Sequence, residues 1–414
     1  MPQRERPWQE HGVSYLVVNA GSSSLKMALF AASAPSDALQ RCLGASVDYH
    51  DMPARLRLRA ADGRLLDERE LPTGCDRLTA AVTHVLAECD RIPGAGTLTA
   101  AGHRVVHGGT RFTAPVRIDP DRLAEMDALT PLAPQHQPHN LAGVRTIARL
   151  RPELAQVACF DTAFHRTQPP VAQRFALPRH WYEQGVRRYG FHGLSYEYIA
   201  DRLREVDPAA AAGRVIVAHL GHGASLCALA AGQSIATSMG FSTLDGLPMG
   251  TRCGALDAGV LLYLLQQAGQ STGDLDDMLY NRSGLLGVSG LSDDMRVLLA
   301  SDTSEAAQAI ALFVYRCVCE IGAMAAALGG VDAVVFTGGI GEHAGPIRQR
   351  ILEALEWLGV EIDASANSGD ALRISTPESA VRAWVIPTDE EQAIAAHCRR
   401  LGAEWADQVP GSPP

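Results

Sequence analysis

The chain has 414 residues, of which 47% are hydrophobic and 20% are charged; this length suits about two domains, and the composition excludes a disordered or fibrous protein. It carries 36 basic and 46 acidic residues, a formal net charge of -10, which is the wrong sign for a protein whose main partner is a nucleic-acid backbone or an anionic membrane. We therefore expect a folded protein with neither partner, in which a local site holds any anionic ligand.

Apolar runs that alternate with helical periodicity predict an α/β fold. In the first half we expect strands over residues 15–19, 25–30, 99–107 and 157–160, and helices over residues 142–150 and 196–205. In the second half we expect strands over residues 215–219 and 332–336, and helices over residues 259–267, 305–328 and 346–358. A last helix, over residues 390–401, could pack on either half. This mixture of strands and helices with parallel crossovers is typical of α/β architecture.

The start of the chain, its apolar stretches and its cysteines predict a cytoplasmic protein. Residues 1–12 contain no apolar segment of the kind that a secretory signal needs, and the longest apolar stretch, residues 310–328, is interrupted by Arg316 and Glu320. The nine cysteines form no C-x-x-C pair, which favours reduced thiols over a zinc or redox site.

Two strand-loop-strand segments, about 200 residues apart, suggest a duplicated domain. Aligning Asn19 with His219, with one inserted residue, brings Ser24 onto Ser225. Two unrelated hairpins with small residues in their turns would give the same pattern, because Gly-Ser turns are common.

Three Gly-rich loops follow strands, at residues 21–26, 221–225 and 338–342. Backbone N–H groups in such turns form concavities that suit a phosphate. The Walker pattern, a Rossmann G-x-G-x-x-G and the protein-kinase signatures are all absent from the sequence. Nucleotide binding would therefore use another fold.

Only one of the 36 basic residues is a lysine, Lys26, and it ends the loop AGSSSLK. The base composition of a genome can by itself favour arginine, so the position of the lysine matters more than its rarity. That position favours a requirement for an ammonium group over retention by chance.

Several charged and imidazole side chains punctuate the apolar segments, among them Arg104, Asp161 and Arg252. Each one alone is explained equally well by an ordinary ion pair or a helix cap, although strand ends in α/β sheets are also where ligands bind. His136 and His139 lack a third and fourth ligand for zinc. Magnesium needs only one or two carboxylates and the substrate phosphates.

Taken together, nine motifs resemble those of the acetate kinase family, in the family order, and span residues 17–391. They are VVNAGSSSLK (17–26), GHRVVHGG (102–109), FDTAFH (160–165), RRYGFHGLSY (187–196), HLGHGAS (219–225), TSMGFSTLDGL (237–247), MGTRCGALD (249–257), FTGGIGEH (336–343) and VIPTDEE (385–391). The resemblance implies an α/β fold of two domains, each with a duplicated βββαβαβα core of the ribonuclease H-like, actin-like ATPase type, and a nucleotide in the cleft between them. We expect an N-terminal domain of residues 13–160 plus 391–406, closed by the C-terminal helix, and a nucleotide-binding domain of residues 161–390. It also implies a homodimer.

The resemblance assigns a role to each matching position. The catalytic group is Asp161, His192, Arg252, Arg104 and His136, and Asn19 and Glu390 hold the metal. Arg104 also binds the substrate, in a pocket with Val106, Gln135, Phe191 and Thr243. The ATP-binding positions are Lys26, His219, Leu220, Gly221, His222, Gly223, Asp294, Met295, Arg296, Gly339, Ile340, Gly341, Glu342 and His343.

The activity that the resemblance implies is reversible phosphorylation of acetate by ATP, giving acetyl phosphate and ADP by direct in-line transfer, with Mg²⁺ or Mn²⁺. A carboxylate is already a nucleophile, so the obstacle is the approach of two anions, and positioning with positive charge must supply most of the catalysis. A kinase for propionate or another short-chain acid is one alternative. A non-catalytic, nucleotide-dependent sensor or assembly module is another, although it would not need a second arginine beside the γ-phosphate.

This chain departs from the family pattern at four positions. His222 and His343 replace the usual Asn in nucleotide loops; Gln135 and Thr243 replace Leu and Pro in the acyl pocket. A buried polar group that the substrate leaves unpaired costs about 1–3 kcal/mol, which leaves the preferred acid open. We assign no function to the roughly dozen residues that precede the family's usual start.

Overall fold

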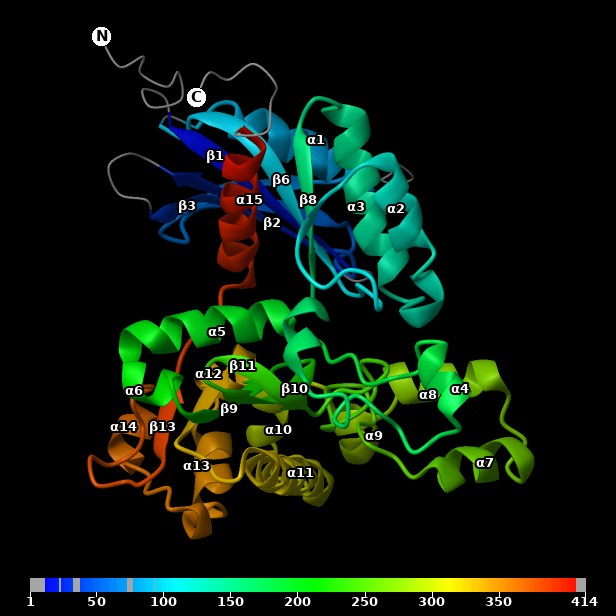
Figure 1. The fold of residues 1–414 in the computed structure, drawn as a ribbon, viewed down its shortest axis with the longest axis vertical. Helices are drawn as coiled ribbons and strands as arrows, with labels where there is room; N and C mark the ends of the chain where they lie inside the picture. Colours follow the sequence, from blue (N-terminus) through cyan, green and yellow to red (C-terminus); the bar gives the residue numbers. More distant parts are fainter. Residues whose placement is uncertain (1–11, 22–23, 33–37, 73–76, 93, 407–414) are drawn as a thin grey trace. The chain divides into compact units, whose positions relative to one another are not determined.

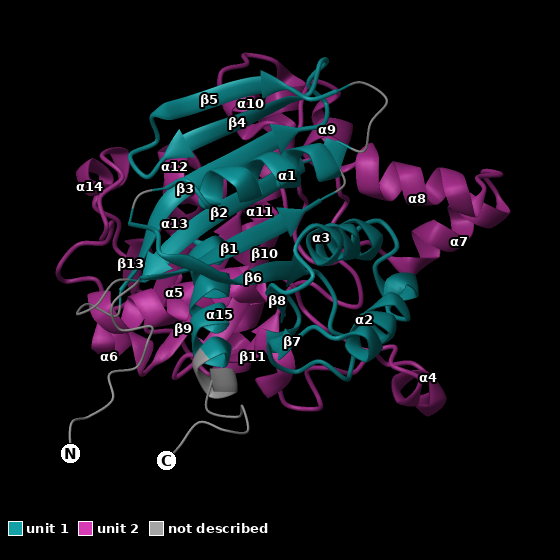
Figure 2. Cartoon of the chain, turned by 90° about the horizontal axis from the view of Figure 1, so that it is seen from above, with its two compact units in different colours: residues 1–163, 389–414 teal, residues 164–388 magenta. Residues whose placement is uncertain are grey.

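The computed structural model describes residues 12–21, 24–32, 38–72, 77–92 and 94–406, with the side chains of residues 403–406 left out. The chain forms two compact units, residues 1–163 with 389–414 and residues 164–388 (Figure 2). These limits differ by a few residues from the expected domain boundaries, so that Asp161 and Glu390 belong to the first unit.

The first unit is built on an eight-stranded sheet in the order β5-β4-β3-β2-β1-β6-β8-β7. Its strands are β1 (Val13–Ala20), β2 (Ser24–Ala32), β3 (Leu39–Asp48), β4 (Arg55–Ala60), β5 (Leu65–Glu70), β6 (Thr97–Val105), β7 (Val116–Arg117) and β8 (Ala155–Phe160). Its helices are α1 (Arg77–Cys89), α2 (Pro120–Asp127), α3 (Gln137–Leu150) and α15 (Glu390–Ala406), with the 3-10 turn η1 (Thr130–Leu132).

Helices cover both faces of this sheet because its central strands are apolar on both sides. Alternate residues of β1, such as Leu16 and Val18, pack with α1 and α3. The opposite face lies against α15 (Figure 1). A Cβ atom on Gly102 of β6 would lie 2.4 Å from Ile394 and 2.6 Å from Cys398, so only glycine allows α15 to approach this closely.

The second unit is built on a five-stranded sheet in the order β11-β10-β9-β12-β13. Its strands are β9 (Arg214–Leu220), β10 (Ala224–Ala230), β11 (Gln233–Thr237), β12 (Ala333–Thr337) and β13 (Arg382–Val385). The helices are α4 (Arg179–Glu183), α5 (Gly193–Val206), α6 (Pro208–Ala211), α7 (Ala258–Gln266), α8 (Thr272–Asn281), α9 (Gly284–Ser289), α10 (Met295–Leu299), α11 (Ser304–Leu328), α12 (Gly338–His343), α13 (Gly345–Glu353) and α14 (Ala364–Ser368), with 3-10 turns η2 (Ala163–Thr167) and η3 (Glu356–Leu358). Helices α5 and α6 cover one face, and α11 packs along β9, β10 and β11 (Figure 1).

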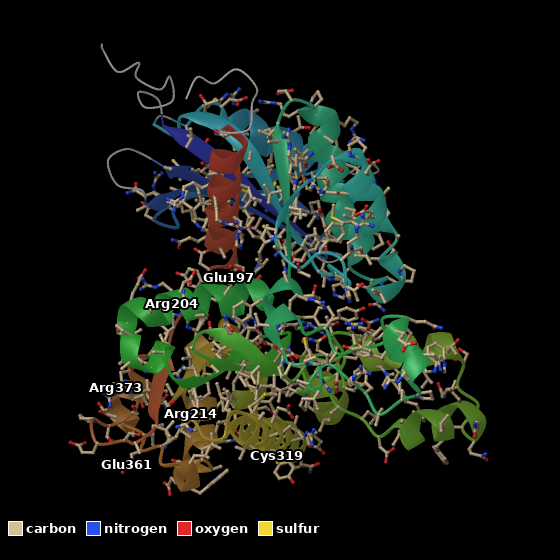
Figure 3. The ribbon with its side chains drawn as sticks, viewed as in Figure 1. Glu197, Arg204, Arg214, Cys319, Glu361 and Arg373 are labelled. Carbon is tan, nitrogen blue, oxygen red and sulfur yellow. The ribbon has the colours of Figure 1, made fainter. Side chains whose placement is uncertain are left out.

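By length and composition alone, α11 could cross a membrane, and 39% of its most apolar window is buried within the structure. Its buried side chains, which include Phe313 and Ile321, are those of a core helix, whereas Cys319 is exposed (Figure 3). The core helices of globular proteins commonly pass this test, so α11 is explained by its packing on the second sheet.

The two sheets share one topology, which supports the predicted duplication. In each sheet three consecutive strands are antiparallel neighbours, and two later strands continue in parallel on the other side of the first of them: β3-β2-β1-β6-β8 matches β11-β10-β9-β12-β13. The expected residue alignment is wrong. Asn19 pairs with Lys26, whereas His219 pairs with Ser225. The second turn is therefore one residue shorter, and Ser225 corresponds to Lys26, not to Ser24.

Most predicted strands and helices are present, with ends shifted by a few residues. The Gly-rich loop predicted after the strand at residues 332–336 is instead the short helix α12. Gly338 opens it with φ of 77°, a left-handed conformation that favours glycine. The last helix packs on the first unit, which settles the alternative left open above.

Candidate active site

Strand alternation gathers one set of candidate residues on the α15 face of the first sheet. Asn19 and Lys26 are paired neighbours in β1 and β2, so their side chains share a face. Arg104 lies two residues after Gly102 and shares its face, and Glu390 is the first residue of α15. These residues come from three parts of the chain: the β1-β2 hairpin, β6 and the start of α15.

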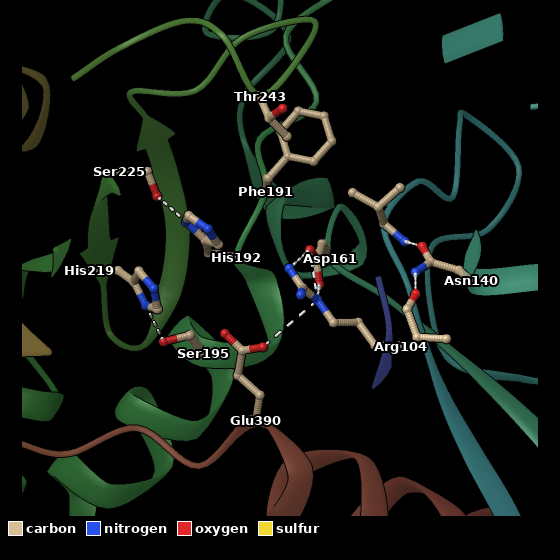
Figure 4. A network of polar contacts seen from close by, with 12 residues as sticks. Arg104, Asn140, Asp161, Phe191, His192, Ser195, His219, Ser225, Thr243 and Glu390 are labelled. Carbon is tan, nitrogen blue, oxygen red and sulfur yellow. Dashed lines mark hydrogen bonds and ion pairs between the residues drawn. The ribbon is translucent and has the colours of Figure 1, made fainter. Parts of the chain in front are cut away.

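Arg104 is the centre of a charged network in the first unit (Figure 4). Its Nε donates to both Asp161 carboxylate oxygens, at 3.0 and 3.2 Å, and its Nη2 donates to Oδ2 at 2.6 Å. The Glu390 carboxylate lies 3.8 Å from Nε. Burial opposes the charge of Arg104, but Asp161 and Glu390 outweigh it and raise the arginine pKa above its ordinary value. Arg104 is thus a fixed cation whose Nε edge is already occupied by Asp161.

Asn140 holds the backbone of Val106, one of the residues predicted to form the acyl pocket. Its Nδ2 donates to the Ala20 carbonyl at 2.7 Å, and its Oδ1 accepts from the Val106 backbone N–H at 2.9 Å. This buried amide ties the end of β1 to the segment after β6. Gln135 and His136 lie half-buried immediately before α3, which is the helix that carries Asn140.

In the second unit, His192 occupies the position before α5 in a left-handed conformation, with φ of 58°. Its Nδ1 is 2.9 Å from the Ser225 hydroxyl, which also contacts the Tyr196 hydroxyl. Its ring stacks on His219, with centroids 4.3 Å apart (Figure 4). The Ser225 contact and the stack fix the orientation of the ring. Backbone strain at such positions is typical of functional sites.

Gly223 shows where His192 and Arg252 converge. A Cβ atom on Gly223 would lie 2.8 Å from Arg252 Nη2 and 3.2 Å from His192 Nε2. Arg252 Nη1 donates to the Thr243 carbonyl at 2.9 Å. Because that bond uses a backbone carbonyl, proline could supply it as well as threonine. The glycine turn therefore has two potential donors to a phosphoryl group beside its backbone.

His165 holds the backbone of Phe191, another residue predicted to line the acyl pocket. Its Nε2 is 2.9 Å from the Phe191 carbonyl and its Nδ1 is 2.9 Å from the Ser234 hydroxyl. A carbonyl only accepts, so Nε2 carries the hydrogen. Burial lowers the pKa of His165 to about 4. The ring is therefore neutral near pH 7, and the neutral ring holds the Phe191 carbonyl.

Side chains of the second unit hold the candidate nucleotide segments through hydrogen bonds. The Ser195 hydroxyl contacts His219 Nδ1 and the Thr388 hydroxyl, both at 2.9 Å. The Glu342 carboxylate accepts from the Gly338 N–H at 2.8 Å and the Thr388 N–H at 3.2 Å. Glu342 thus positions the loop, and the backbone of α12 is the part available to a ligand.

Two further nucleotide segments meet through a substituted residue. His222 Nε2 lies 3.0 Å from the Asp293 carboxylate. The next residue, Asp294, caps α10 and forms a two-point ion pair with Arg296. The histidine that replaces the usual Asn therefore connects the β9-β10 turn with the start of α10.

The two predicted metal positions suit a cation that prefers oxygen ligands, such as magnesium. Across the residues that the structure describes, no group of three or more His, Cys, Asp or Glu side chains could hold a metal ion. Asn19 and Glu390 offer one amide and one carboxylate oxygen. Mg²⁺ keeps most of its waters and takes one or two protein oxygens together with substrate phosphates.

Comparison with known proteins agrees with this geometry. The acetate kinase of Rhodopseudomonas palustris (strain TIE-1) is 53% identical over 390 residues, covering 93% of this chain and 98% of that protein. The acetate kinase of Rhizobium meliloti is 51% identical over 387 residues, covering 93% and 98%. Among solved structures, Porphyromonas gingivalis acetate kinase has a TM-score of 0.83 at 37% identity, covering 94% of this chain and 99% of that one. A propionate kinase from Francisella tularensis has a TM-score of 0.84 at 35% identity, covering 92% and 98%.

These solved kinases share the two sheets described above, which define the class: an α/β protein of the actin-like ATPase fold. The model of the acetokinase family matches residues 14–396. The chain belongs to the acetokinase family.

Each unit brings part of the predicted set together. In the first unit Arg104, Asp161 and Glu390 form one network. In the second unit His192 stacks on His219, and a side chain on Gly223 would touch both His192 and Arg252. Part of the set does not join these networks: within the described chain Arg296 forms its ion pair with Asp294, two residues away, and the His343 side chain is 74% exposed.

The sequence reasoning assigned no role to the residues that hold the site. These are Asn140, His165, Ser195, Ser225, Arg348 and Thr388. Four of them, His165, Ser195, Ser225 and Thr388, lie inside motifs that were recognised, so their place could have drawn attention. Arg348 gave no signal, because an arginine in an amphipathic helix normally faces solvent.

Proposed function

We propose that the chain phosphorylates acetate with ATP, giving acetyl phosphate and ADP reversibly by direct in-line transfer. One observation carries the proposal: acetate kinases are about half identical to this chain over nearly its whole length. The charged networks of the two units fit the chemistry, because the reaction must bring a carboxylate to a polyphosphate.

In the first unit, Arg104 binds the carboxylate of the acid through the part of its guanidinium that Asp161 does not use. Asp161 keeps the guanidinium in one orientation and accepts no proton, because a carboxylate nucleophile has none to give. Val106 forms an apolar wall for the methyl group, and Asn140 fixes its backbone.

In the second unit, Arg252 and His192 neutralise the charge that spreads over the transferring phosphoryl group. Both approach Gly223, and the turn it belongs to offers backbone N–H groups to phosphate. Lys26 adds a point charge from the first unit. Preorganised donors of this kind need no rearrangement during the reaction.

Magnesium would be held by Asn19 and Glu390, and it would neutralise phosphate charge and orient the polyphosphate. Mn²⁺ prefers similar oxygen ligands. Glu390 also lies beside Arg104, which couples the metal position to the acid-binding arginine.

Propionate is the second candidate substrate. A propionate kinase matches this fold as well as an acetate kinase does, and Gln135 and Thr243 depart from the usual acyl pocket. Hydroxylamine trapping of the acyl phosphate, with acetate, propionate, butyrate and glycolate in parallel, separates the candidates. A higher kcat/KM for acetate is the expected result. Higher turnover of another acid would make that acid the substrate without changing the proposed mechanism. ATP binding without any turnover would favour a sensor.

The Arg252→Ala variant tests the mechanism. We expect kcat to fall by at least tenfold, which corresponds to about 1.4 kcal/mol of lost transition-state stabilisation, while ATP binding changes much less. Isothermal titration with ATP and the trapping assay measure the two separately. An unchanged kcat would remove Arg252 from the transition state.

We further propose a cytoplasmic homodimer. The helix α7 has no charged residue and no buried one; Leu262 and Tyr263 are 55% and 62% exposed. An apolar surface of this kind is typical of a protein interface, and a second copy is the occupant we propose. Light scattering should give twice the mass of the chain, and Leu262→Asp should reduce it to the mass of one copy.

A further inference from the structure

Lys26 is the only side-chain amine of the chain, and the structure leaves it accessible. The remaining 35 basic residues are arginines, whose guanidinium stays protonated and is a poor nucleophile. Lys26 is exposed in β2, between the buried Leu25 and Met27. Among the described residues, none forms a salt bridge or a side-chain hydrogen bond with its ammonium group.

The same amine lies among the candidate metal and phosphate positions. Lys26 is paired with Asn19 and therefore faces α15. Helix α15 packs on β1 and β2, and its first turn carries Glu390. Lys26 therefore lies on the sheet face that also holds the two predicted metal positions.

An acyl phosphate is a mixed anhydride and acylates amines. The lone pair of a neutral lysine Nζ attacks the carbonyl carbon, the bond from that carbon to the phosphate oxygen breaks, and inorganic phosphate leaves with the electron pair. The nitrogen releases a proton to water, and an amide remains. The lysine thereby loses its charge.

We propose that Lys26 is a self-acylation site, at which accumulated acyl phosphate product converts the ammonium into an uncharged amide and lowers the activity. The inference rests on the proposed function, because the acylating agent is its product. Loss of a charge-assisted contact to phosphate should lower activity by about 10- to 100-fold. Product accumulation would then switch off the subunits that have reacted.

The experiment follows label and activity together. The full chain is incubated with Mg-ATP and deuterated acetate, and separately with acetyl phosphate alone. Peptide mass spectrometry locates the acetyl groups, and hydroxylamine trapping measures turnover in the same samples. We expect label at Lys26 in both incubations and a loss of activity in proportion to it. The Lys26→Arg protein should carry no label at this position and should lose none of its own starting activity during the incubation.

An added amine serves as the matched control. Arg91 follows α1, and its side chain is 71% exposed; the Arg91→Lys variant therefore presents a second amine away from the loop. We expect Lys26 to be labelled faster than position 91 during turnover, and label at position 91 to leave activity unchanged.

Failure of the inference and failure of the proposed function give different results. Turnover without label at Lys26, or label without loss of activity, would overturn the inference and leave the function standing. No trapped acetyl phosphate would overturn the function. The incubation with acetyl phosphate alone would still decide whether Lys26 reacts and whether acylation reduces ATP binding.

Discussion

Arg104 and Asp161 show how one pair can position a site without proton transfer. Asp161 is 1% exposed and binds the Nε edge of the guanidinium at two points. A buried carboxylate is stable here only because it is paired. The pair fixes the plane of the guanidinium, and under the proposed function that plane would set the direction from which a substrate carboxylate is bound.

Replacing Asp161 with Asn keeps the size of the side chain and removes the charge. We expect kcat for acetate phosphorylation to fall about 10- to 100-fold, because a charge-assisted hydrogen bond contributes about 1.5–3 kcal/mol. Asp121→Asn, an exposed position in the first turn of α2, is the matched control and should keep the original kcat. Equal kcat values for the two variants would contradict the positioning role.

Arg348 is the largest fully buried side chain of the described residues. Its guanidinium donates to the Gly341 and Glu342 carbonyls at the end of α12, to Asn367, and to Asp370. One charged group thus satisfies several backbone carbonyls beside a nucleotide segment.

Removing the charge of Arg348 should lower the free energy of unfolding. Arg348→Met leaves the buried Gly341 and Asn367 acceptors without their donor, and each buried acceptor left unsatisfied costs about 1–3 kcal/mol. Asp370 is 48% exposed, so water can take over its part of the ion pair. Urea unfolding should show the loss, with Arg350→Met, an exposed position of α13, as the control. A shift no larger than that of the control would mean that the α12 carbonyls find other donors.

At the scale of elements, the turn between β9 and β10 is where a single added methyl group should lower the activity most. Gly223 closes this turn by accepting the Gly221 N–H at 3.0 Å. Its missing side chain is the space into which Arg252 and His192 reach.

The Gly223→Ala variant should therefore fold but work poorly. The added Cβ would lie 2.8 Å from Arg252 Nη2, and the flexible arginine can move away at little cost to stability but leaves its catalytic position. We expect kcat to fall by at least tenfold, or about 1.4 kcal/mol, with an unfolding temperature close to that of the parent. Gly402→Ala on α15, where no atom lies within 4 Å of an added Cβ, should leave kcat unchanged and raise the unfolding temperature slightly, because alanine favours a helix more than glycine does.

The same turns show what the sequence could and could not predict. Strand and helix positions follow from apolar periodicity, and the nine motifs carried the fold class and the family. The sequence did not predict the register of the first hairpin. A run of small residues does not show how many of them form the turn and how many belong to the strands. Braces such as Asn140 and Arg348 were missed because their partners are backbone groups, which a sequence does not distinguish.

For the whole molecule, three buried histidines set the response to acid. Burial lowers the pKa of His103, His107 and His165 to about 4, against an ordinary value of 6.5. Between these two values the unfolded chain binds more protons than the folded one, so the free energy of unfolding falls as the pH falls. The loss begins near pH 6.5 and grows toward pH 4.

We expect urea midpoints to decrease steadily from pH 7 to pH 5, with at most about 3 kcal/mol per histidine at full protonation. Most carboxylates stay ionised in this range, so the histidines dominate the slope. His103→Gln, which can still bond to Gln156, should make the slope shallower. Midpoints that do not change between pH 7 and pH 5 would show that these rings are protonated in the folded protein.

The position of α15 has a consequence for synthesis. The strands of the first sheet leave the ribosome hundreds of residues before α15 does, yet α15 covers one of their faces. The second unit, residues 164–388, contains all of its own strands and can fold as soon as it emerges. The first unit must wait with an uncovered apolar face around Gly102. In a nascent chain halted before residue 390, the second unit should therefore resist protease. The first unit should still be open to protease and should still bind chaperones.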